Sequence, residues 1–129
     1  MNKQPDRESI RAMQPGRELD ALVEQYVFGN KVRWVQDLIT DQYPVSDQEG
    51  YIVDYYSTDI SAAWEVVEKM SKTCFSEVAM TELDDGAWGW MARFILVLNE
   101  PYTVKGYRAT AKTAPEAICK AALLAVLEE

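Results

Sequence analysis

YSTDISAAWEVVEKM (residues 56–70) predicts a helix from about Asp59 to Ser71. Ser57, Thr58 and Asp59 offer side-chain oxygens that accept hydrogen bonds from the free N–H groups at a helix start. Apolar residues recur at helical spacing, so we expect one buried face with glutamates outside it. The residues expected on the buried face are Ile60, Ala63, Trp64 and Val67.

TAPEAICKAALLAVLEE (residues 113–129) predicts a second helix that begins with a capping box. The Thr113 hydroxyl can accept a hydrogen bond from the Glu116 N–H, while the Glu116 carboxylate can accept one from the Thr113 N–H. Pro115 costs no helical hydrogen bond, because the first-turn N–H groups have no partner inside a helix. The small alanines of this helix favour close packing on a sheet.

Three strands are predicted between these two helices, over Phe75–Leu83, Trp88–Leu98 and Tyr107–Lys112. The sequence Asp-Asp-Gly at 84–86 predicts a tight hairpin turn, since glycine readily adopts positive φ. Residues 94–98 are apolar without alternation, which is typical of a strand covered on both faces. We expect residues 99–106 to form a longer loop.

The first half of the chain has weaker patterns. Residues 1–15 are polar and predict a flexible arm, and residues 16–129 predict a single domain. A one-sided apolar stripe predicts a helix over Arg17–Phe28. Val32, Trp34, Leu38 and Ile39 suggest one short strand and Tyr51–Val53 another, with turn-forming residues between them.

The predicted class is α+β, in the order helix, two short strands, helix, three strands, helix. We expect an antiparallel sheet of three or more strands sandwiched by helices. The two later helices would cover one face of the sheet, and the first helix would cover the other.

The composition excludes several kinds of site. The chain has no histidine, which removes Ser-His and Cys-His nucleophile pairs and most zinc sites. Cys74 and Cys119 lie far apart in apolar surroundings, so we expect free thiols. No apolar stretch is long enough for a membrane span, and no signal peptide is evident, so a cytoplasmic protein is expected. We therefore predict a protein that is not an enzyme and needs no cofactor or metal.

The negative charge is concentrated in one window. The net charge is −8, and residues 34–68 contain no Lys or Arg. Such a field repels nucleic acid and attracts cations or basic proteins, so no binding to a nucleic-acid duplex is expected. The acids of this window are Asp37, Asp41, Asp47, Glu49, Asp54, Asp59, Glu65 and Glu68.

Three phrases resemble the phage ABA sandwich domain family of small bacteriophage and prophage proteins: GRELDALV (16–23), YSTDISAAWEVVEKM (56–70) and TAPEAICKAALLAVLE (113–128). They cover the chain in order from about Gly16 to Glu128. The resemblance implies an α/β sandwich and a phage origin. It brings no assigned reaction, cofactor or catalytic residue, so no functional residue is transferred.

Two groups of residues are candidates for binding. The acids Asp41, Asp47 and Glu49 suggest a solvated loop, a docking face for a basic protein or a divalent-cation site, although they lack the spacing of a calcium loop. The aromatic residues could thicken the core or stack on a base, with free N–H groups at Ser57, Thr58 and Asp59 taking a phosphate. The aromatic candidates are Trp34, Tyr51, Tyr55, Tyr56, Trp88 and Trp90.

The functional expectation is a phage-encoded binding protein that acts in the host cytoplasm against host defence. It would engage a basic host protein or sequester a nucleotide signal, and it would not contact a membrane. One alternative is a phage assembly accessory that self-associates as a homo-oligomer. A further alternative is an enzyme that depends on carboxylates and magnesium.

Overall fold

The computed structural model describes residues 4–36, 42–47 and 50–127. The fold is α+β, and the order of helices and strands from the first domain helix onward is the predicted one. In chain order the elements are α1 (Arg7–Ala12), α2 (Arg17–Leu22), the π-helical turn η1 (Val23–Val27), β1 (Val32–Gln36), β2 (Gln42–Ser46), α3 (Ile60–Met70), β3 (Phe75–Glu82), β4 (Trp88–Asn99), β5 (Tyr102–Ala111) and α4 (Ala114–Leu127).

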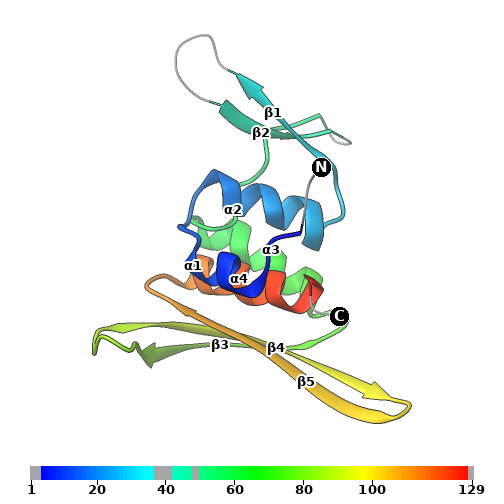
Figure 1. Cartoon of the computed structure of the whole chain (residues 1–129), viewed down its shortest axis with the longest axis vertical. Helices are drawn as coiled ribbons and strands as arrows, with labels where there is room; N and C mark the ends of the chain where they lie inside the picture. The colour runs from blue at the N-terminus through cyan, green and yellow to red at the C-terminus, as the bar shows by residue number, and fades with distance from the viewer. Residues whose placement is uncertain (1–3, 37–41, 48–49, 128–129) are drawn as a thin grey trace.

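The main sheet is antiparallel, with β4 between β3 and β5. Helix α4 packs across β4 and β5 (Figure 1). Ala92 and Phe94 of β4 and Ala109 of β5 are buried on this side of the sheet. We call this side the inner face and the opposite side the outer face.

Helix α4 lies at the centre of the molecule (Figure 1). Besides the two strands, it contacts α3, η1 and α1. Ala117, Ala121 and Ala122 are fully buried, and so are Ile118 and Leu123. The alanines let backbones approach from several directions, so α4 is enclosed on nearly all sides, as expected for a helix that is apolar all round.

The first helix does not cover the second face of the sheet. Helix α2 and η1 lie on the side of α4 that faces away from the sheet (Figure 1). That part of the prediction was wrong, because α4 itself has an apolar surface that the sheet alone cannot bury. Within the described residues no helix lies on the outer face, and Ile95 and Val97 stay partly exposed there.

Helix α3 is rotated relative to the prediction. Ala63 and Val67 are buried as expected, but Ile60 and Trp64 are about half exposed. The reason is that α3 packs mainly beside α4, not on the sheet. The residues that face this neighbour and are buried are Ala62, Ala63, Val66, Val67 and Met70.

The segment expected as a flexible arm contains helix α1. Asp6 caps this helix by accepting a hydrogen bond from the Ser9 N–H at 2.8 Å. Ile10 is buried, and the Lys120 ammonium donates to the Arg11 carbonyl at 3.0 Å. The Glu116 carboxylate lies 2.6 Å from the same ammonium, so one arm of the predicted capping box is diverted to an ion pair. The Thr113 hydroxyl still accepts from the Glu116 N–H.

Two loops differ from their predictions. Strand β2 lies within the stretch expected to form a turn, while residues 51–53 contribute only one bridge, between Ile52 and Val45. Strand β5 begins at Tyr102, so the hairpin after β4 is shorter than expected. Leu38 and Ile39 lie outside the described residues. The turn at 84–86 forms as predicted, with Gly86 at φ +86°.

A buried polar network ties the segment before α3 to α2 and η1. The Asp20 carboxylate accepts from the Ser57 N–H at 2.8 Å and from the Ser57 hydroxyl at 2.6 Å. The Glu24 carboxylate accepts from the Tyr56 hydroxyl at 2.6 Å and from the Asn30 side-chain amide. Both carboxylates are fully buried. Burial, followed by the hydrogen bond to Glu24, raises the pKa of Tyr56 well above its usual value.

The substitution Tyr56→Phe should lower the free energy of unfolding by about 2 kcal/mol, because it leaves a buried carboxylate without one of its donors. Chemical denaturation monitored by circular dichroism measures this change. Tyr55→Phe is the matched control, since Tyr55 is exposed, and it should change stability by less than about 0.5 kcal/mol. Equal effects of the two substitutions would contradict the role given to the network.

Both cysteines are free, as predicted. Burial, with smaller contributions from Asp20 and Glu116, raises the pKa of the Cys119 thiol well above its usual value.

A thiol reagent should therefore modify Cys74 but not Cys119 in the native protein at neutral pH, because the thiolate is the reactive form. Titration with a chromophoric disulfide should count one reactive thiol in the native protein and two after denaturation. Rapid modification of both thiols in the native state would contradict the burial of Cys119.

Candidate functional site

An open groove runs between α3 and the edge strand β3. It arises because α4 covers β4 and β5, whereas only weak contacts join α3 to β3. The inner side of β3 therefore has no helix packed closely on it. The cavity has a volume of about 610 Å³. We call it the α3–β3 groove, and it is lined by Ile60, Trp64, Val67, Ser76, Val78, Trp90, Lys112, Thr113, Ala114, Pro115 and Ile118.

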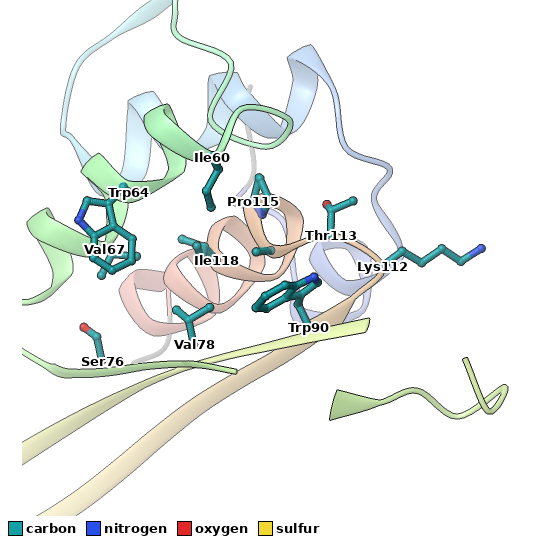
Figure 2. A pocket seen from close by; sticks show the side chains of 11 residues that line it. Ile60, Trp64, Val67, Ser76, Val78, Trp90, Lys112, Thr113, Pro115 and Ile118 are labelled. Atoms are coloured by element: carbon teal, nitrogen blue, oxygen red, sulfur yellow. The ribbon is translucent and has the colours of Figure 1, made fainter. Parts of the chain in front are cut away.

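Two tryptophans lie on different walls of the α3–β3 groove. Trp64 projects from α3 and Trp90 from β4, with Ile118 and Val78 between them (Figure 2). Trp64 is 53% exposed, while Trp90 is partly buried and packs against the core. The groove therefore presents two flat aromatic surfaces above an apolar floor.

Two polar residues of the groove, Lys112 and Thr113, lie near one end, and Ser76 lies toward the other (Figure 2). Thr113 and Lys112 lie where β5 gives way to α4, and the Lys112 side chain extends outward from the groove (Figure 2). Among the described residues, Lys112 is the one charged residue in the lining, and no carboxylate lines the groove. The groove thus differs in charge from the chain as a whole, whose net charge is −8.

The apolar surface continues past the groove along the sheet. Met80 pairs with Trp90 across β3 and β4, and Trp88 lies on the same face two residues earlier. Trp88 is 71% exposed and Met80 is also exposed. Trp88 and Trp90, which were predicted to share a strand face, do so.

The predicted aromatic site does not form as one cluster. Trp34 lies on the β1–β2 hairpin, at the opposite end of the molecule from the three-stranded sheet that holds Trp88 and Trp90 (Figure 1). Tyr51 follows β2 and is exposed. The Tyr55 ring lies under the Arg17 guanidinium, and the distance between the ring centre and the Arg17 Cζ atom is 3.9 Å.

The predicted phosphate site at residues 57–59 is wrong, because its N–H groups already have acceptors. The Ser57 N–H donates to Asp20, and those of Thr58 and Asp59 donate to the Tyr55 carbonyl. The Asp59 side chain caps α3 by accepting from the Ser61 N–H. Tyr56, whose ring stacks on Phe28 with centres 5.1 Å apart, is a core residue. The N–H groups of residues 57–59 therefore join elements of the fold together.

The acidic window is only partly described. Asp41 and Glu49 lie outside the described residues, as does Asp37. Asp47 forms an ion pair with Arg33 at 2.7 Å. The negative charge of Asp47 is therefore balanced by an arginine that lies just outside the acidic window. Among the described residues no group of three acids, cysteines or histidines is placed to hold a metal ion.

The exposed acids Asp54, Glu65 and Glu68 form a small acidic surface at α3, which we call the acidic side of α3. Desolvation, followed by repulsion from Asp54, Glu68 and Glu24, raises the pKa of Glu65. Asp54, Glu68 and the buried Glu24 therefore lie close enough to Glu65 to repel its carboxylate. A basic group brought to this surface would relieve that repulsion.

Sequence reasoning missed Trp64, Ile60, Lys112 and Thr113 as site residues. Trp64 was assigned to the core because its spacing fits a helical stripe with Ile60. An alternative stripe of small and β-branched residues, 62–63 and 66–67 with Met70, fits the pattern equally well, and it is the buried one. A choice between the two stripes required the position of α4.

Comparison with known proteins identifies the family. The family model described as phage ABA sandwich domain matches residues 21–123. Searches of curated proteins and of solved structures gave no match. In the described part of the chain no helix is long and apolar enough to cross a membrane. The family match spans most of the chain and agrees with the three phrases that suggested it, so the chain belongs to the phage ABA sandwich domain family.

Proposed function

We propose that this protein is a non-catalytic binding protein, and that its α3–β3 groove takes up a flat, negatively charged small molecule of the nucleotide class. The observation that carries the proposal is the make-up of the groove. In a chain of net charge −8, its lining combines two indole rings and one lysine with no carboxylate. An anion is repelled less there than on the acidic side of α3.

The size and shape of the groove support this ligand class. A volume of about 610 Å³ lies within the usual range of small-molecule pockets. Stacking of a base on an aromatic side chain contributes about 1–3 kcal/mol and tolerates any base, because every base has a π-face. Lys112 is flexible enough to turn toward a phosphate at the end of the groove.

The groove side chains favour binding over catalysis. Its hydroxyl groups, on Ser76 and Thr113, have no histidine, carboxylate or second lysine beside them in the lining to accept a proton. Under this proposal a ligand is held and released unchanged. A phage protein of this kind would act in the host cytoplasm by removing a nucleotide signal of host defence.

A docking face for a basic protein is the second candidate. It is favoured by two exposed acids one turn apart on α3, Glu65 and Glu68, and by the exposed Asp54, whose charge repels the Glu65 carboxylate. This surface differs from the one expected around Asp41, Asp47 and Glu49, because Asp47 is already paired with Arg33.

Isothermal titration with a panel of linear and cyclic nucleotides tests the first candidate. Trp90→Ala should weaken binding of the best ligand by about 10-fold or more, which corresponds to the loss of one stacking contact. Trp64→Ala should act in the same direction. Trp34→Ala is the matched control, because Trp34 lies on the distant β1–β2 hairpin, and it should leave the affinity unchanged. The proposal fails if no nucleotide binds, or if only Trp34→Ala weakens binding.

Charge reversal separates the two candidates. The double substitution Glu65→Lys with Glu68→Lys should abolish capture of a basic protein partner if the acidic side of α3 is the docking face. It should leave nucleotide affinity within about 2-fold, since neither residue lines the groove. Surface plasmon resonance with immobilised variants measures both. Unchanged capture of the partner would refute the acidic docking face.

A further inference from the structure

The outer face of the three-stranded sheet carries exposed apolar side chains, and no helix among the described residues covers it. Phe75 is 70% exposed and Tyr102 is 72% exposed. Ile95 and Val97 of β4 and Val104 of β5 lie between or beside them on the same face, as the strand register requires. An exposed apolar patch of neighbouring residues marks an interaction surface.

We propose that this outer face binds the same face of a second copy of the chain, with a two-fold axis along β4. Sheets that pack face to face keep their strands roughly aligned. A two-fold axis along the central strand places β3 of each copy over β5 of the other. We call the paired residues on β3, β4 and β5 a row. Each row in one copy then faces the same row in the other copy, with the β3 residue of one opposite the β5 residue of the other.

The two ends of the charged row are complementary under this operation. Glu77, Arg93 and Arg108 form one row across β3, β4 and β5. Glu77 pairs with Arg93 of its own chain, whereas none of the ion pairs among the described residues involves Arg108. In the proposed dimer, Glu77 of each copy faces Arg108 of the other. The Arg93 side chains of the two copies meet at the axis, where each is paired with its own Glu77.

The neighbouring row is complementary in shape. Phe75, Ile95 and Gly106 form this row, so each Phe75 faces Gly106 of the second copy. Gly106 needs explanation, because glycine weakens a strand and nothing in this chain requires it. A Cβ atom there would meet only the Arg93 side chain, at 4.0 Å, and its φ is not in the left-handed region. Close approach of a partner ring accounts for a glycine at this position.

The face is also close to the size that a biological interface needs. Strands about 4.8 Å apart and ten residues long give a footprint of roughly 14 by 33 Å. That footprint, about 460 Å², is close to the roughly 500 Å² per partner at the lower limit for a biological interface. The α3–β3 groove opens on the inner side of the sheet, so association would leave it accessible.

The first test fills the space above Gly106. Sedimentation equilibrium of the full chain should give a mass of twice 14.7 kDa at high concentration. Gly106→Phe should shift this to 14.7 kDa while the melting temperature of the monomer stays the same or rises, because phenylalanine favours strands. Lys105→Phe, on the inner face of the same strand, is the matched control and should remain dimeric.

The second test uses mixed charges and does not depend on Gly106. Glu77→Arg and Arg108→Glu should each be monomeric alone, since like charges then face one another. An equimolar mixture of the two variants should form a heterodimer, because each mismatch is resolved across the axis. Lys31→Glu, away from the sheet, should leave the dimer intact. A wild-type chain that is monomeric at every concentration overturns the proposal. So does a dimer that survives Gly106→Phe, or two charge variants that do not associate when mixed.

Discussion

The burial of α4 on nearly all sides is the constraint on which the rest of the structure depends. A helix with alanines and leucines on all sides cannot pack on a sheet with one side alone, because its other sides would expose apolar surface to water. The sheet takes one side, and α1, η1 and α3 must take the others. The first helix is therefore unavailable to the outer face of the sheet. One helix also cannot span three strands, so the inner side of β3 is left open.

The buried carboxylates Asp20 and Glu24 hold this arrangement at a second point. Two buried acids without donors would cost several kcal/mol. Their position is tolerable because Ser57 and the Arg17 guanidinium donate to Asp20. Tyr56 and Asn30 donate to Glu24. This requirement fixes the segment before α3 against α2 and η1. It also sets where α3 begins and hence the direction in which Trp64 points. A polar network just before α3 thus helps to position the helix that forms one wall of the groove.

Local patterns were sufficient for the helices and most of the strands. The caps at Asp59 and Thr113 and the turn at Gly86 depend on neighbouring residues, and each was predicted from a few letters of sequence. Strand β2 was missed because its central Pro44 and flanking polar residues resemble a turn, whereas its pairing with β1 is a non-local interaction. The groove could not be predicted, since it depends on which strands α4 covers. The N–H groups of residues 57–59 looked free because their acceptor Asp20 lies far away in the sequence.

The two open sides of the sheet have different chemistry, and this difference argues for different occupants. The inner groove has concave walls, two indoles and a flexible cation, which suit a small ligand that is surrounded when bound. The outer face is a sheet surface with charged residues in one row and a glycine in the same row as a phenylalanine, which suits a second sheet. Strand β4 contributes Trp90 to the inner groove and Arg93 to the outer face. The small ligand and the second copy of the chain would therefore both contact this strand. Strand β4 is hydrogen-bonded to a neighbour on each edge and is the least able of the three to move. Association through the outer face would therefore hold Trp90 in place for stacking without blocking the entrance to the groove.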